Sequence, residues 1–159
     1  MPEIFVGAGS NAAPGRALKA AALELQRQFG ALRLSNVYRS RALGAAAADY
    51  LNLVVALTTE RDVDSVREAL RAIEALAGRS RRDPAVVELD LDLLLYGSCV
   101  DAARRLPRPG AFTLPFVLGP LAELAPALVH PVTGERCAVA WRNVRRADLQ
   151  DLGALPALD

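Results

Sequence analysis

The chain has 159 residues, 52% hydrophobic and 23% charged, so it is long enough for one domain with a full core and too apolar to be disordered. Its net charge of +1 gives no bias towards nucleic acid or anionic membranes, and no apolar run approaches the ~18 residues of a membrane span. The N-terminus lacks the basic start and cleavage site of a signal peptide. We therefore expect a soluble, cytoplasmic protein with a single domain over residues 1–159, in which residues 136–159 form a C-terminal extension.

Hydrophobic periodicity predicts an alternation of strands and helices. The helices are indicated by apolar residues at helical spacing, by Pro14 in a first turn, by Asp62 as an N-cap, and by Gly30 and Gly78 after the last turns. The order is β-α-β-β-α-β, which predicts an α+β, ferredoxin-like fold with an antiparallel sheet, helices packed on one face and extra C-terminal elements. The expected strands are 3–9, 32–40, 49–59 and 87–96, and the expected helices are 14–29, 63–77 and a short one within 116–126.

Several residue types carry little functional information by themselves. Lys19 is the only lysine, and every other basic side chain apart from His130 is an arginine. A GC-rich genome and phosphate binding are two alternative explanations of this preference. Cys99 and Cys137 are too far apart in the sequence for a zinc motif and do not form a disulfide framework, so we expect reduced thiols. His130 has no nearby nucleophilic partner, and we assign it no role.

The segment VELDLDLLLYG (87–97) places acids at alternate positions of an apolar strand. Alternation puts Glu88, Asp90 and Asp92 on one face, about 7 Å apart along the strand, where a cation would relieve their repulsion. Oxygen ligands without histidine or cysteine favour Mg²⁺. An exposed strand with its acids in water is the alternative. The opposite face, which we expect to pack under the helices, holds Val87, Leu89, Leu91, Leu93 and Leu95.

The neighbours of this strand favour the metal hypothesis. Arg79, Arg81 and Arg82 precede it, and Glu74 lies just ahead of them. Acids for a metal beside arginines for phosphate are typical of phosphoryl transfer, which depends on positioning and charge neutralisation. A dinucleotide-binding loop at residues 7–12 is set aside, because the second strand does not end in the acid that such a fold requires.

Six segments, in order, resemble the 6-hydroxymethyl-7,8-dihydropterin pyrophosphokinase family. The resemblance covers roughly residues 3–130. Members of this family transfer pyrophosphate from ATP to the hydroxymethyl group of a pterin and release AMP, in folate biosynthesis. The segments are V-x-x-GSN at 6–11, S-x-x-Y-R-S at 35–40, DYLN at 49–52, IE-x-x-x-GR-x-R at 73–81, LDLDLLLYG at 89–97 and FVLGPLAELAP at 116–126.

The resemblance implies roles for particular residues. It implies two Mg²⁺ ions shared by Asp90 and Asp92, a monomer, and small-molecule partners only, namely ATP and the pterin. Catalytic roles would fall to Arg79, Arg81, Asp90 and Asp92. Nucleotide contacts would come from Glu74, Arg79 and Arg81, to which we add Arg82 and Arg108 as candidates, and the pterin slot from Ser40, Leu43, Tyr50, Asn52 and Phe116.

The sequence also departs from the family pattern. The family places an arginine where this chain has Val87, another where it has Leu114, and proline-histidine where it has Pro107 and Arg108. A single transition-state arginine can contribute on the order of 10³ or more in rate. The alternative hypothesis is therefore a divergent paralogue that binds pterin without turnover or acts on a modified pterin. Candidates to compensate for the lost arginines are Arg82, Arg104, Arg105 and Arg108.

A nucleic-acid-binding ferredoxin-like module is a third hypothesis. Such modules present exposed aromatic and basic residues on the sheet. Aromatic residues make up only 5% of this chain, and the expected sheet face carries acids instead. We therefore expect no nucleic-acid partner and no membrane association.

Overall fold

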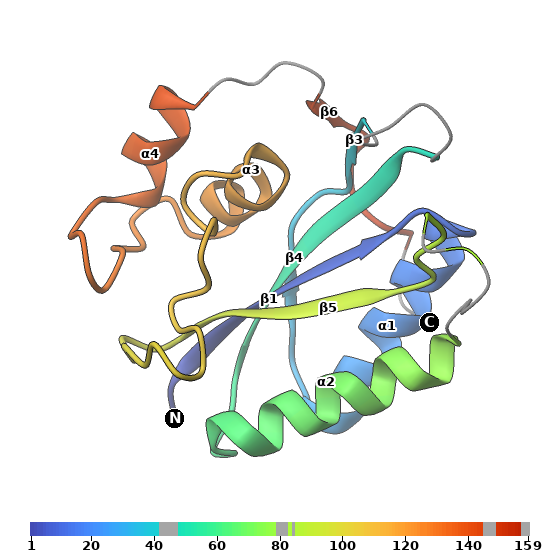
Figure 1. Cartoon of the computed structure of the whole chain (residues 1–159), viewed down its shortest axis with the longest axis horizontal. Helices are drawn as coiled ribbons and strands as arrows, with labels where there is room; N and C mark the ends of the chain where they lie inside the picture. The colour runs from blue at the N-terminus through green and yellow to red at the C-terminus, as the bar shows by residue number, and fades with distance from the viewer. Residues whose placement is uncertain (42–47, 79–82, 84, 145–148, 157–159) are drawn as a thin grey trace.

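The structure is a computed structural model, which describes residues 1–41, 48–78, 83, 85–144 and 149–156. The order of its first seven elements confirms the predicted β-α-β-β-α-β pattern, with one expected strand divided in two (Figure 1). The elements are β1 (Glu3–Ser10), α1 (Pro14–Phe29), β2 (Arg33–Leu34), β3 (Tyr38–Ser40), β4 (Tyr50–Thr58), α2 (Val63–Ala77), β5 (Asp90–Tyr96), α3 (Pro115–Leu124), α4 (Cys137–Asn143) and β6 (Leu149–Asp151).

The sheet has the strand order β5-β1-β4-β3-β6, with β2 also paired to β4. All of its pairs are antiparallel. The two strands that lie next to each other at its centre, β1 and β4, are separated in the chain by α1, β2 and β3. This is the ferredoxin-like arrangement, so the predicted fold is confirmed.

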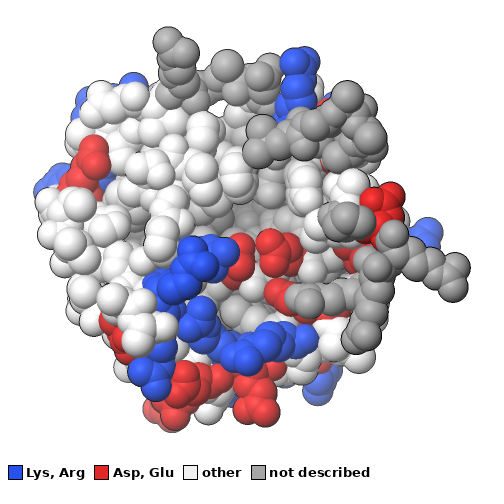
Figure 2. All heavy atoms as spheres, viewed as in Figure 1, with Lys and Arg blue, Asp and Glu red and all other residues white. Residues whose placement is uncertain are grey.

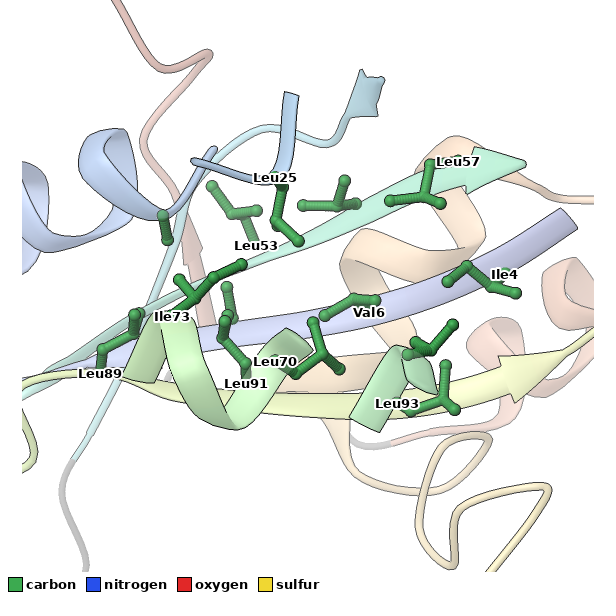
Figure 3. Close-up of a cluster of buried hydrophobic side chains, with 14 of the residues drawn as sticks. Ile4, Val6, Leu25, Leu53, Leu57, Leu70, Ile73, Leu89, Leu91 and Leu93 are labelled. Carbon is green, nitrogen blue, oxygen red and sulfur yellow. The ribbon is translucent and has the colours of Figure 1, made fainter. Parts of the chain in front are cut away.

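Helices α1 and α2 cover one face of the sheet, and a hydrophobic core fills the space between these helices and the strands (Figure 3). Leu25 of α1 and Ile73 of α2 are 0% and 2% exposed, and they pack with Val6 of β1 and Leu53 of β4. The predicted capping is also present, because the Asp62 carboxylate accepts a hydrogen bond of 2.8 Å from the amide of residue 65. Amphipathic periodicity therefore places both helices correctly.

The opposite face of the sheet is covered by α3 and α4, which form a second core. Leu118 and Leu121 of α3 are fully buried and pack with Phe5 of β1 and Val54 of β4. Helices thus cover both faces, and the expectation of helices on one face holds only for α1 and α2. In Figure 1, α3 and α4 lie on the other side of the central strands from α1 and α2.

The expected strand at 32–40 is divided into β2 and β3. Between them lies Ser35, which is buried and bonds to β4 through its hydroxyl and its amide: its Oγ accepts from the Val54 amide at 2.9 Å, and its own amide donates to the Val54 carbonyl at 3.0 Å. The hydroxyl thus takes the place of a backbone partner at the break between the strands.

The expected strand at 87–96 begins only at Asp90, and it contains a register shift. Leu93 pairs with Val6, but Leu95 pairs with Phe5, so β5 has one extra residue there. Leu95 consequently lies in the core under α3 and not under α1 and α2, and its predicted position was wrong. Val87, half-buried, precedes the strand, so the predicted alternation does not extend to it.

The described part of the C-terminal extension contains two regular elements. It contains α4, which packs in the second core, and β6, which adds a strand beside β3. Within the described ranges, no helix is both long and apolar enough to cross a lipid bilayer.

Candidate active site

Asp90 and Asp92 begin β5 and project from the face of the sheet that α3 covers. Their neighbours on β1 are Gly9 and Gly7, which have no side chains to fill the space beside the carboxylates. The apolar residues between and beyond them, Leu91 and Leu93, point into the core under α1 and α2. The predicted separation of acids and leucines is therefore present at these positions.

The surroundings of Asp92 oppose its negative charge. The pKa of its carboxyl is raised to about 6, mainly by burial and also by the neighbouring charges of Asp90 and Glu74, while those of Arg108 and Arg105 act in the opposite direction. Arg108 approaches directly, with Nη2 3.2 Å from Oδ1 of Asp92, and both side chains are about 30% exposed. Among the described residues, each of these two side chains forms its salt bridge with the other.

Two neighbouring oxygen-donor carboxylates, the exposed Asp90 and the half-buried Asp92, fit a hard divalent cation. They supply two protein ligands, which leaves the other coordination positions to water and phosphate oxygens. Glu88 does not complete a three-ligand cluster, since the described residues contain no group of three or more acidic, histidine or cysteine side chains able to hold a metal. The strand begins at Asp90, so the alternation that would have aligned Glu88 with the aspartates is absent.

Glu74 lies at the edge of β5. Its side chain is 7% exposed, and Oε1 accepts a hydrogen bond of 2.8 Å from the amide of Leu91. The sequence predicted a nucleotide contact for this carboxylate, but this oxygen bonds to the edge strand. Glu74 therefore fixes β5 against α2 directly beside the aspartates.

Asn52 of β4 forms the polar centre of the same sheet face. It is 8% exposed, and its Nδ2 donates to the Ser40 hydroxyl at 2.9 Å. A Cβ added at Gly9, its partner on β1, would lie 2.8 Å from the Asn52 Oδ1. A side chain at residue 9 would thus displace the amide, and glycine allows Asn52 and Asp90 to flank one strand on the same face.

The aromatic residues of the predicted pterin slot belong to elements on the same side of the sheet as Asn52. Tyr50 is two residues from Asn52 on β4 and pairs with Ser40 of β3, so both share the Asn52 face. Phe116 is 37% exposed on the first turn of α3, the helix that covers this face. The structure thus brings four of the five predicted slot residues to one side of the sheet, and the fifth, Leu43, lies outside the described residues.

Some of the predicted arginines lie within the described residues, and those that do have different partners. Arg79, Arg81 and Arg82 lie outside the described residues. Arg104 is engaged elsewhere, because its guanidinium forms two hydrogen bonds with Asp64 at 2.9 and 2.8 Å. Of the predicted arginines within the described ranges, Arg108 is the one that contacts Asp92.

Asn11, directly after β1, has a structural role that the sequence analysis missed. The Asn11 side chain donates to the Ala85 carbonyl at 2.7 Å and accepts from the Val87 backbone amide at 2.6 Å. The backbone amide of Asn11 donates to the Val87 carbonyl at 3.0 Å. Asn11 therefore ties the segment before β5 to the end of β1. A polar residue directly after a buried strand was the available signal.

Charge is unevenly distributed over this side of the molecule. Figure 2 shows acidic side chains in a central hollow and a band of basic side chains along one side of it. A separate cavity of about 460 Å³ is lined by the loop at 100–113 and by residues between 130 and 135. It touches the site through Arg105 and Arg108 and includes neither Asp90 nor Asp92, so it is not the candidate active site.

A ferredoxin-like sheet with paired aspartates and an arginine on one face is the arrangement expected of a metal-dependent phosphoryl-transfer protein. The family model for 7,8-dihydro-6-hydroxymethylpterin-pyrophosphokinase matches residues 5–126. The chain belongs to this family, which confirms the resemblance found in the sequence.

Curated relatives are named 2-amino-4-hydroxy-6-hydroxymethyldihydropteridine pyrophosphokinase. The one from Synechocystis is 41% identical over 65% of this chain and 54% of its own length. The one from Methylorubrum extorquens is 36% identical over 81% of this chain and 86% of its own length. The chain thus spans about half of the first relative and most of the second.

Among solved structures, wild-type Plasmodium falciparum HPPK-DHPS with pteroate is similar over 89% of this chain and 44% of that chain, with a TM-score of 0.69. The sequence identity is 11%, so this likeness supports the fold alone.

Proposed function

We propose that the chain transfers pyrophosphate from ATP to the hydroxymethyl group of 6-hydroxymethyl-7,8-dihydropterin and releases AMP. The observation that carries the proposal is the half-buried Asp92 beside Asp90, with Arg108 3.2 Å away, in a chain of the pyrophosphokinase family. The names of the relatives favour this reaction over the paralogue without turnover.

In this proposal, Asp90 and Asp92 hold two Mg²⁺ ions, and the carboxylates bind them in their charged forms. When bound, Mg²⁺ would neutralise charge on the triphosphate and lower the pKa of the pterin hydroxyl. Arg108 and the predicted Arg79, Arg81 and Arg82 contact phosphate oxygens, for which a guanidinium is suited.

The pterin is assigned to the other half of the same sheet face. Asn52 offers a donor and an acceptor to the polar edge of the pterin, and the bond with Ser40 fixes which amide atom faces which way. Tyr50 and Phe116 supply ring faces or edges. Because Asn52 and Asp90 flank Gly9 on adjacent strands, the pterin and the phosphates would meet above β1. The substrate hydroxyl would then attack the β-phosphorus in line with the departing AMP.

The direct test is to mix the protein with ATP, Mg²⁺ and the hydroxymethyl-dihydropterin and to measure AMP by chromatography. We expect AMP in proportion to the pterin consumed, and none when the pterin or Mg²⁺ is left out. Pterin binding in a titration without any AMP would contradict the proposal and support the paralogue that binds without turnover.

A further inference from the structure

Arg108 is positioned by the same strand whose aspartate it contacts. Its backbone amide donates to the Leu94 carbonyl at 2.8 Å, two residues beyond Asp92 on β5. The side chain then returns towards Asp92, and the contact joins one guanidinium nitrogen to one carboxylate oxygen at 3.2 Å. The backbone anchor fixes the start of the side chain, so the guanidinium stays near the carboxylate without a bidentate bond to it.

The neighbouring Arg104 is a contrast within the same loop. It holds Asp64 through Nε and Nη2 at 2.9 and 2.8 Å and also binds Asp101 through Nη1 at 2.9 Å. Three short contacts of this kind fix a side chain, whereas a single contact of 3.2 Å leaves most of the five N–H donors of a guanidinium for another acceptor. Arg104 therefore fastens the loop to α2, and Arg108 is able to exchange its partner.

We infer that Arg108 is a built-in counter-cation that neutralises Asp92 before substrate binding and moves to a phosphate oxygen of the nucleotide when metal and nucleotide bind. The inference rests on the proposed function. Without metal, Asp92 lies half-buried beside Asp90, and among the residues that the structure describes Arg108 is the cation in contact with it. A divalent cation on the same carboxylate repels the guanidinium, whose nearest new anion is the phosphate chain of the nucleotide.

This exchange links metal binding to nucleotide binding. Metal alone has to displace Arg108 without offering it another partner, whereas metal together with nucleotide supplies that partner. The two ligands therefore bind with positive coupling, which by linkage is the same in both directions. Arg108 acts here as a positioning residue for the metal site and as a binding residue for the nucleotide.

The experiment compares wild type with Arg108→Met, which keeps the length of the side chain and removes its charge. Mn²⁺ binding without nucleotide is followed by electron paramagnetic resonance, and binding of α,β-methylene-ATP with saturating Mg²⁺ is followed by calorimetry. We expect Mn²⁺ alone to bind about fivefold more tightly, because a competing cation has gone. We expect the nucleotide to bind on the order of tenfold more weakly, because a charged hydrogen bond has been lost.

Arg104→Met is the matched control, with the same change of charge in the same loop. It should leave the ratio of the two affinities near that of wild type. Opposite shifts in Arg108→Met alone support the inference, whereas parallel weakening of both ligands, or no change in either, overturns it. The outcome is separable from the proposed function, because wild-type protein that forms AMP can still fail this test, and protein that forms no AMP can still show the metal exchange.

Discussion

Asp92 carries a charge that its position in the fold opposes. Burial and the neighbouring Asp90 raise the pKa of its carboxyl to about 6, while Arg108 only partly offsets them. In the unfolded chain the same group titrates near its ordinary value of 3.8. The ionised form of Asp92 therefore costs stability in the folded state, as expected of a group kept for binding a cation.

Asp92→Asn should raise the free energy of unfolding at pH 7.5 by on the order of 1 kcal/mol, because it removes a charge that folding disfavours. Folding raises the pKa of this acid, so wild type regains stability as the pH falls from about 6 towards 3.8, and the advantage of the variant should shrink over that range. Urea denaturation at pH 7.5 and pH 4.5, followed by the fluorescence of the single tryptophan, Trp141, measures both values.

The matched control for this experiment is Asp83→Asn, an exposed aspartate in the loop before β5. It should change stability little at either pH. An Asp92→Asn protein that is less stable than wild type at pH 7.5 would show that the carboxylate contributes more through contacts than it costs through burial.

At the scale of elements, the start of β5 depends on β1. The three hydrogen bonds between Asn11 and residues 85 and 87 hold the segment that leads into Asp90. Sequence periodicity located both strands, but it could not show this connection, because a turn residue reaches across 74 or more positions of the chain. Nor could it show the extra residue in β5, since the leucine run at 93–95 has no polar residue to mark which face each member takes.

Asn11→Ala should lower the free energy of unfolding by roughly 1–3 kcal/mol, because the backbone groups of residues 85 and 87 lose their side-chain hydrogen-bond partner. It should also reduce the rate of AMP formation, because the segment that leads into Asp90 is no longer held to β1. Denaturation and steady-state assays measure the two effects. Asn36→Ala is a matched control: Asn36 makes a 3.2 Å side-chain bond to exposed Asp151 and should have much smaller effects. Equal behaviour of the two variants would disprove the role of Asn11.

At the scale of the whole molecule, the sequence was sufficient to predict the fold, the sheet face on which Asp90 and Asp92 lie, and the grouping of Ser40, Asn52 and Tyr50. It did not predict that α3 and α4 cover the second sheet face or that β6 forms, because short amphipathic elements have weak periodicity. The pairing of Arg108 with Asp92 depends on how a proline-rich loop returns to β5, which no local pattern reports.

Leu114 stands where the resemblance to the family leads us to expect an arginine. It is 41% exposed at the start of α3, so a longer side chain can be accommodated. Leu114→Arg should increase the rate of AMP formation several-fold, because it adds a cation beside the phosphates. Leu152→Arg, at 39% exposure after β6, is the matched control. An equal change in both variants would indicate a general effect of charge.

A crystal structure of the protein with α,β-methylene-ATP and Mn²⁺ tests the central claim most directly, because the anomalous signal of manganese locates the metal. The account predicts metal in contact with carboxylate oxygens of both Asp90 and Asp92, and the phosphate chain beside it. A nucleotide bound elsewhere, or metal-free aspartates directed into solvent beside a bound nucleotide, would contradict it.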